Sequence, residues 1–480
     1  MKKIFSMMCT FLSLNISLAQ SWIKLNTPRF ANAPILSICT DKSGNLYAAG
    51  TFTDSASELK GDCFVAKWNG TLWSELGIGG GALNANGQIN SICADTTGNL
   101  YVAGAFTSGA TDTNGYHYVA VYNPASAAWS ELGAGSHPLH ANNVIYSICT
   151  DVDGNVYAAG DFKDSTGYWY VAVYNRSTGD WSELGAGTHP LHANNTIYTI
   201  CTDLSNNVYA AGDFTDTNFL GGTIDNNLYR YVAKYTAAIG DWDSLGSGCL
   251  NFIEGPDPGS YNIYTLCADT KGNIFAAGDF GDTLHAYVAK WDGTSWSKLI
   301  DGDTILDGDI FSLCTDAAGN IYAGGGFINS EENSYVAEYS ITTGLWGELG
   351  GYNSLRANGG ALSVCMDAIG NIYAGGGFND GHFATDTGKY FVVEYTHANT
   401  GVSVVNKNDD VNIYPNPTNN ILNIKQSGMI SAEYFLYDIT GRLELSGVLK
   451  NGNTSVDVGG LASGVYLLRV GEKVCKVVKE

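Results

Sequence analysis

Beyond residue 20 the chain repeats one pattern of apolar and polar positions seven times. In the second copy, four short apolar stretches are separated by Gly, Asn and Asp residues; they span residues 89–94, 100–106, 118–122 and 129–132. Short stretches rich in β-branched and aromatic residues between turn residues predict strands. Each copy is therefore expected to form a four-stranded antiparallel sheet, with strands A to D in chain order.

One cysteine in strand A marks every copy, and the copies follow one another at spacings of roughly fifty residues. The seven cysteines are Cys39, Cys93, Cys149, Cys201, Cys267, Cys314 and Cys365. Four-stranded repeats of this length are typical of β-propeller blades. The chain is therefore predicted to be an all-β protein with a seven-bladed β-propeller over residues 20–400.

A tryptophan in strand D predicts how the ring closes. Six copies carry one, at Trp73, Trp129, Trp181, Trp242, Trp296 and Trp346, but none follows the seventh cysteine. A matching strand stands at the other end of the repeats, where residues 21–25 resemble residues 72–76. We expect this N-terminal segment to be the outer strand of the last blade, because a closed ring leaves no unpaired sheet edge there.

Side-chain size follows the narrowing of the blades toward the axis of the ring. Inner strands need slim side chains, and strand A supplies Ser and Cys, whereas the tryptophan belongs to the outermost strand. The cysteines invite a metal-binding or disulfide interpretation, but seven equivalent positions cannot all pair among themselves. We interpret them as buried thiols, which behave as small apolar side chains.

The N-terminus has the composition of an export signal. In residues 1–19, Lys2 and Lys3 precede an apolar run that ends in small residues. This order is typical of a secretory signal peptide, with cleavage expected between Ala19 and Gln20. No other stretch is apolar enough to span a bilayer.

The C-terminal residues no longer follow the repeat. Residues 401–410 are a polar linker, and residues 411–480 carry the motif residues Pro415, Asn416, Pro417, Gly441, Arg442, Gly464, Tyr466 and Lys479. In this order they resemble the sorting domain of the type IX secretion system, a small Ig-like β-sandwich. An ordinary adhesive Ig-like module is the alternative, because a fold alone does not give a function.

The blades themselves resemble the Asp-x-x-Gly-Asn-x-Tyr-x-Ala-Gly propeller repeats of secreted bacterial proteins. Together the two resemblances imply a Bacteroidota-type protein that crosses the inner membrane by Sec. They also imply that the type IX machinery recognises the tail. The protein would then be released or held at the outer-membrane surface.

The negative charge of the chain is confined to the repeats. Residues 20–401 carry 14 Lys and Arg but 39 Asp and Glu, a net charge of −25, whereas residues 402–480 carry eight of each. Such a surface repels phosphate backbones and anionic lipids, which argues against nucleic-acid and direct membrane binding. Cations, basic proteins and neutral glycans remain as partners, and solubility alone is the simplest explanation.

Two repeated motifs have the residue types of metal sites. The Asp-x-x-Gly-Asn turn between strands A and B supplies one carboxylate per blade, short of the six to eight oxygens that calcium needs, and this chemistry suits a tight turn. His137, His140, His189 and His192 stand in loops between strand D and the next strand A. There the pattern Leu-x-Ala-Asn persists while x changes, so we expect a loop shape rather than a zinc site, and no metal or cofactor.

No catalytic constellation is visible, because no nucleophile elbow, phosphate-binding glycine loop or arginine cluster appears. We therefore expect a monomeric, non-enzymatic binding protein with a protein or glycan ligand; the alternative is a secreted glycan-active hydrolase or lyase. The B–C and D–A loops vary most in length and content. We expect any ligand on the face that they form, with the insertions at 217–228 and 247–260 in blade 4 contributing most.

Overall fold

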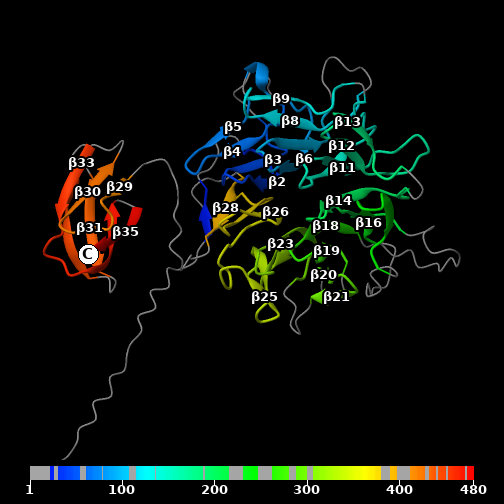
Figure 1. Ribbon diagram of the computed structural model, residues 1–480. Coiled ribbons are helices and arrows are strands. Elements are labelled where there is room, and N and C mark those ends of the chain that lie inside the picture. Colours follow the sequence, from blue (N-terminus) through cyan, green and yellow to red (C-terminus); the bar gives the residue numbers. More distant parts are fainter. Residues whose placement is uncertain are drawn as a thin grey trace, which may run out of the picture. The chain divides into compact units, whose positions relative to one another are not determined.

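The computed structural model describes residues 22–25, 31–53, 61–77, 79–107, 115–135, 137–186, 190–215, 231–246, 262–280, 288–299, 306–379, 390–396, 411–426, 432–438, 442–449, 452–470 and 473–479. Contacts divide the chain into two units, Met1–Ala398 and Asn399–Glu480, and each is described by itself. Seven four-stranded antiparallel sheets make up the described part of the first unit, in chain order around a ring (Figure 1).

Blades 1 to 3 run from the inner strand A to the outer strand D as follows. Blade 1 is β2 (Ile35–Thr40), β3 (Leu46–Gly50), β4 (Ala66–Trp68) and β5 (Trp73–Glu75), followed by the short 3-10 helix η1 (Gly79–Gly81). Blade 2 is β6 (Ile89–Ala94), β7 (Leu100–Gly104), β8 (Ala120–Asn123) and β9 (Ala128–Glu131). Blade 3 is β10 (Ile145–Thr150), β11 (Val156–Gly160), β12 (Ala172–Asn175) and β13 (Asp180–Glu183).

Blades 4 to 7 follow the same order. Blade 4 is β14 (Ile197–Thr202), β15 (Val208–Gly212), β16 (Ala233–Thr236) and β17 (Asp241–Ser244); blade 5 is β18 (Ile263–Ala268), β19 (Ile274–Gly278), β20 (Val288–Trp291) and β21 (Trp296–Leu299). Blade 6 is β22 (Ile310–Thr315), β23 (Ile321–Ile328), β24 (Ser334–Ser340) and β25 (Leu345–Glu348). Blade 7 is β26 (Ala361–Met366), β27 (Ile372–Gly376), β28 (Val392–Tyr395) and, from the N-terminus, β1 (Trp22–Lys24).

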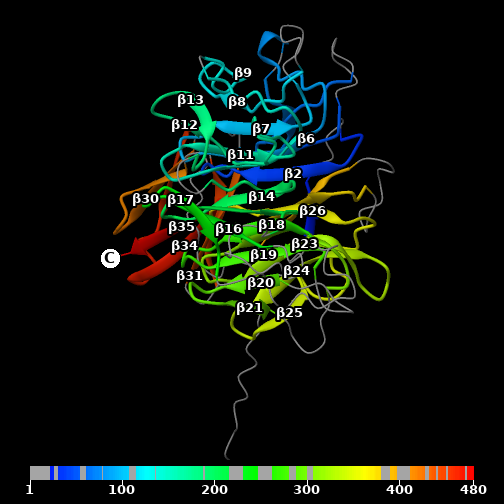
Figure 2. The same cartoon turned by 90° about the vertical axis from the view of Figure 1, so that its right-hand side faces the viewer.

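The ring closes where β1 completes blade 7. β1 pairs antiparallel with β28, which places Trp22 opposite Tyr395. The indole N–H of Trp22 donates to the carbonyl of Leu349 in blade 6 at 3.1 Å. Strands β2 and β26 of the first and last blades lie side by side (Figure 2). The predicted seven-bladed ring with an N-terminal closing strand is confirmed.

One repeated hydrogen bond joins every inner strand to the next. The third residue of strand A is Ser or Thr, and its hydroxyl accepts the backbone N–H of the fourth residue of the next strand A. The seven acceptors are Ser37, Ser91, Ser147, Thr199, Thr265, Ser312 and Ser363. Because Ser363 accepts from Ile38 of blade 1, these bonds run around the whole ring.

Apolar side chains pack mainly between neighbouring blades. Between blades 2 and 3, for example, Tyr101 and Val119 pack in one cluster with Ile145 and Phe162. At the outer edge, a strand D tryptophan donates to the carbonyl of a leucine in the preceding blade. The donors are Trp22, Trp129, Trp181, Trp242, Trp296 and Trp346.

A β-bulge in strand A changes which side chains line the axis of the ring. In all seven blades the register with strand B shifts between the first and third residues of strand A. A bulge re-aims the side chain of the extra residue, and here that second residue is half-buried in every blade. Small or slim side chains were expected in the inner strands, as at the Ser and Cys positions of strand A. The second position departs from this expectation in four blades, where Tyr146, Tyr198, Tyr264 and Phe311 stand.

The second unit contains two antiparallel sheets. One is formed by β29 (Val411–Tyr414), β30 (Ile421–Gln426) and β33 (Gly452–Asp457). The other is formed by β31 (Ala432–Asp438), β32 (Leu443–Leu449), β34 (Gly464–Val470) and β35 (Lys473–Lys479). Leu422 and Val456 of the first sheet and Leu436 and Leu468 of the second share one buried cluster. The unit is therefore a β-sandwich, and the Ig-like description stays a prediction.

Candidate functional site

The Asp-x-x-Gly-Asn turns use their carboxylates within the turn. In blade 3, Oδ1 of Asp151 accepts the backbone N–H groups of Asp153 and Asn155, at 3.0 and 2.9 Å. Its Oδ2 accepts the Asn155 amide at 2.8 Å and the Tyr157 hydroxyl at 2.9 Å. Since a carboxylate offers about four acceptor positions, this arrangement favours a structural role for the motif over a calcium site.

The Leu-x-Ala-Asn loops have one backbone shape in the four blades that carry them. The x residue has a positive φ in each: 52° at Asn84, 47° at His140, 42° at His192 and 52° at Arg356. This region is one that Asn and His enter more readily than most residues. The expected loop shape is therefore seen, and the x side chain is the part that changes from blade to blade.

Three of the four predicted loop histidines lie in described residues. His140 stacks on Tyr116 with 4.8 Å between ring centroids, and His192 stacks on Tyr168 at 4.7 Å. The Nδ1 of His137 lies 3.3 Å from a carboxylate oxygen of Asp180. His189 lies outside the described residues.

One cluster of possible metal ligands forms in the described residues, and it includes His192. A ligand atom of His192, from the loop before blade 4, lies within 4.8 Å of carboxylate oxygens of Asp164 and Glu183. Asp164 belongs to the B–C loop of blade 3, and Glu183 ends β13. Burial raises the pKa of Glu183, the negative charge of Asp164 raises it further, and electrostatic attraction to His192 lowers it.

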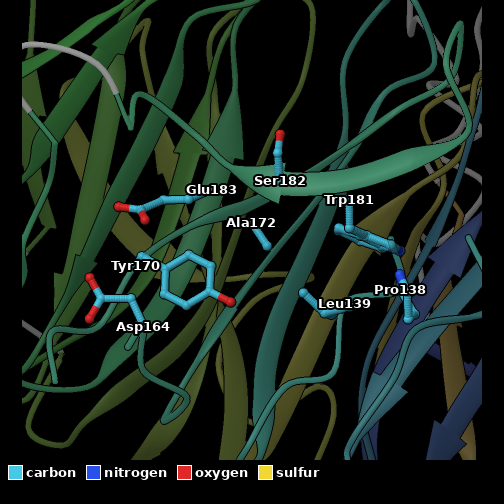
Figure 3. Close-up of a pocket in the computed structure, with 8 residues that line it drawn as sticks. All are labelled: Pro138, Leu139, Asp164, Tyr170, Ala172, Trp181, Ser182 and Glu183. Atoms are coloured by element: carbon cyan, nitrogen blue, oxygen red, sulfur yellow. The ribbon is translucent and has the colours of Figure 1, made fainter. Parts of the chain in front are cut away.

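The two carboxylates of this cluster border a small cavity of about 170 Å³. Figure 3 shows Asp164 and Glu183 with their carboxylates at one end, away from Trp181 and Pro138. Sequence reasoning considered only histidines here, and so missed both acids. Aligning the second and third repeats would have found them, because both repeats carry Asp, Glu and His at the same three places.

An arc of aromatic rings lies at the start of the inner strands of four neighbouring blades. The arc consists of the bulged strand A residues of blades 3 to 6, Tyr146, Tyr198, Tyr264 and Phe311. Successive ring centroids lie 5.7, 5.8 and 5.9 Å apart. All four side chains are half-buried, so each leaves part of its ring exposed. Strand A begins at the D–A loops, so the arc lies on the face that the variable loops form.

Aspartates stand beside this arc at the ends of strand B. Asp161, Asp213 and Asp279 occupy one position in blades 3, 4 and 5. The hydroxyl of Tyr264 donates to Asp279 at 2.9 Å, and burial with the nearby acids raises the pKa of Tyr264 to about 12. Burial and Asp279 raise the pKa of Asp309. The aromatic arc is therefore bordered by negative charge.

The strand A cysteines are free thiols in the structure. Burial raises the pKa of each, and neighbouring thiols add to the effect, as Cys201 and Cys314 do at Cys267. The pKa of Cys314 rises to about 12. Thiols with raised pKa values stay protonated at neutral pH, and are poor nucleophiles and metal ligands in that form.

Several motif residues of the second unit hold its last strand. The Asn416 side chain accepts from the backbone of Val478 at 2.8 Å and donates to the carbonyl of Lys476 at 2.7 Å. It lies between Pro415 and Pro417. Gly464 pairs with Lys479 at the end of the β34–β35 ladder, which brings the C-terminal residues against the motif.

The remaining motif residues support the strand ends. The Tyr466 hydroxyl donates to the Ala462 carbonyl at 2.8 Å, and the exposed Arg442 pairs with Asp438 and Glu444. Gly441, the expected Ala19–Gln20 cleavage site and both blade 4 insertions lie outside the described residues. Among the described residues no helix is long and apolar enough to cross a membrane.

Comparison with protein families identifies the tail. Residues 412–480 match the model described as the secretion system C-terminal sorting domain. The chain therefore carries the type IX sorting domain that the motif residues suggested, and such a domain directs it to the cell surface or outside. A search of curated proteins finds no match.

Solved structures similar to this chain are β-propeller proteins. They include PorZ, an essential surface component of the type IX secretion system of Porphyromonas gingivalis, with 13% identity, a TM-score of 0.47, and coverage of 93% of this chain and 59% of that one. The extracellular domain of BT4673 from B. thetaiotaomicron has 15% identity, a TM-score of 0.49, and coverage of 96% and 59%. The WD40 propeller of Doa1 has 13% identity, a TM-score of 0.49, and coverage of 80% and 100%. The chain thus spans about 59% of the first two.

Proposed function

We propose that this secreted propeller is a non-enzymatic binding protein whose ligand docks on the aromatic arc of blades 3 to 6. The aromatic arc of Tyr146, Tyr198, Tyr264 and Phe311 carries the proposal. Partly exposed aromatic rings in mutual contact offer apolar area at low entropic cost, and such residues dominate binding surfaces. The type IX tail supports an extracellular setting for the ligand.

The charge beside the arc favours a ligand with a cationic group. Asp161, Asp213 and Asp279 border the rings, and an ammonium or guanidinium over an aromatic face is attracted by about 0.5–2 kcal/mol. The net charge of −25 on residues 20–401 would also steer a basic partner toward the propeller. A protein segment rich in Lys or Arg fits these features better than an anionic glycan.

Titration of the purified full chain with Lys- and Arg-rich peptides, beside neutral and anionic glycans, tests the proposal. We expect Tyr198→Leu to weaken peptide binding about tenfold or more, with little effect on melting, because Leu36 and Leu362 occupy this position in blades 1 and 7. Leu204→Ser, an exposed residue of an A–B turn, is the control on the opposite face. Equal binding by both variants would refute the aromatic-arc site, and glycan cleavage in the same screen would instead support the enzyme alternative.

A further inference from the structure

The Asp164, Glu183 and His192 cluster occurs twice in the sequence. The aligned residues of blade 2 are Asp112, Glu131 and His140; Asp112 lies outside the described residues. His140 stacks on Tyr116 as His192 stacks on Tyr168, with interplanar angles of 17° and 15°. A cavity of about 150 Å³ borders Glu131 as the blade 3 cavity borders Glu183. The two blades thus carry the same three residue types in sequence, and their described histidines stand on the same loop shape.

Blade 6 carries a different set of residues at the same three positions. Its residues are Asn329, Glu348 and Arg356. The Asn329 amide donates to both carboxylate oxygens of Glu348, at 3.3 and 3.4 Å. The Glu348 carboxylate also accepts the backbone N–H of Asn353, so a single acid with these donors needs no external cation. Blade 6 therefore shows how this loop pair is built when its own residues compensate the charge.

In blade 3 the corresponding charge is not compensated in this way. The hydrogen bonds from Thr166 and Tyr168 all reach Oδ1 of Asp164, which shapes the B–C loop. Among the described residues, no side-chain or backbone group donates a hydrogen bond to Oδ2 of Asp164, and none donates one to the Glu183 carboxylate. Two partly buried carboxylates this close repel each other unless a cation or a shared proton lies between them.

We propose that Asp164, Glu183 and His192 bind a divalent transition-metal ion of the Zn²⁺ class. Zn²⁺ bonds His nitrogen and carboxylate oxygen at about 2.0–2.2 Å. Ligand atoms within 4.8 Å of one another thus need only small rotations to meet around one ion. Imidazole selects for Zn²⁺ over Ca²⁺ and Mg²⁺, and three protein ligands leave a coordination position toward the cavity.

Isothermal titration of the metal-stripped full chain with Zn²⁺ tests this proposal. The wild type should bind one equivalent more than His192→Asn. Asn is the matched replacement, because Asn84 has this backbone conformation in blade 1 with a φ of 52°. His137→Asn, in the same loop type but outside the cluster, is the control and should bind as the wild type does.

A second readout separates metal binding from damage to the fold. Co²⁺ absorption should show an imidazole-dependent spectrum that His192→Asn weakens. Metal-free melting of that variant should match the wild type. Failure of the wild type to bind Zn²⁺, or unchanged stoichiometry in His192→Asn, overturns the blade 3 site.

Discussion

The closure of the ring can be tested at its tryptophans, because the Trp22 indole forms a hydrogen bond that the Trp73 indole lacks in the described structure. The Trp22 indole is buried, packs on Tyr395 with centroids 5.4 Å apart, and donates to the Leu349 carbonyl at 3.1 Å. Trp73 occupies the same place in blade 1, but its buried indole nitrogen has no partner within the described structure. We therefore expect Trp22→Phe and Trp73→Phe to have unequal costs.

The size of the difference follows from the hydrogen bond. Both substitutions remove similar apolar area, so that contribution largely cancels between them. Trp22→Phe also removes the indole hydrogen bond to the Leu349 carbonyl. This carbonyl keeps the Ser354 hydroxyl as a donor at 2.8 Å, so the cost is that of one hydrogen bond, about 0.5–1.5 kcal/mol. Trp73→Phe removes a buried donor that has no acceptor, and so avoids this cost. The free energy of unfolding should fall by about 0.5–1.5 kcal/mol more for Trp22→Phe.

Urea unfolding of the full chain, followed by tryptophan fluorescence and by far-UV circular dichroism, provides the measurement. The comparison holds where both probes report one transition for the propeller with a common denaturant slope. Trp129→Phe, which loses an indole hydrogen bond of 2.7 Å within the ring, should lose at least as much stability as Trp22→Phe. Equal losses for Trp22→Phe and Trp73→Phe would refute the idea that β1 is bonded into the ring like any other outer strand.

Two further predictions concern export and acid stability. Removing residues 411–480 should leave the propeller in the periplasm, as measured by immunoblotting of cell fractions; normal appearance of the truncated chain outside the cell would contradict this. Burial would raise the pKa values of Asp95 and Asp316, but hydrogen bonds, chiefly from Asn99 and Asn320, hold both below the ordinary value. A carboxyl group whose pKa is lower in the folded than in the unfolded chain stabilises the fold at pH values above its unfolded pKa. The free energy of unfolding should therefore fall as the pH drops below about 4. A constant free energy of unfolding from pH 5 to 2 would contradict this.

Much of the fold could be predicted because each blade repeats residues whose contacts are also repeated. The Asp-x-x-Gly-Asn-x-Tyr motif works as one unit, since Asp151 bonds both Asn155 and Tyr157. The position of Trp22 before the first strand A was enough to predict the closing strand. The β-bulge was not predictable from apolar alternation, because one extra residue in strand A leaves the pattern of small and apolar neighbours almost unchanged.

The candidate sites were harder to predict because they join residues from different connections. Glu183 and His192 reach Asp164 only because the B–C loop of blade 3 lies against the loop that leads into blade 4. The bridge between Trp169 and Ala193 holds those two loops together. A search for ligands close in sequence sees His189 and His192, which are three residues apart, and passes over two acids that lie more distant along the chain.

The division between repeated and varied positions also indicates how a ligand approaches. The third residue of strand A is Ser or Thr in every blade and is used in the bonds that close the ring. The neighbouring second residue is Leu36 in blade 1, Asn90 in blade 2 and Leu362 in blade 7, against an unbroken aromatic run in blades 3 to 6. Aspartates end strand B in blades 3 to 5, where Gly326 and Gly377 stand in blades 6 and 7. Aromatic rings and acids at this end of the inner strands are thus concentrated on one side of the ring, which suits the proposed ligand if it lies off the axis.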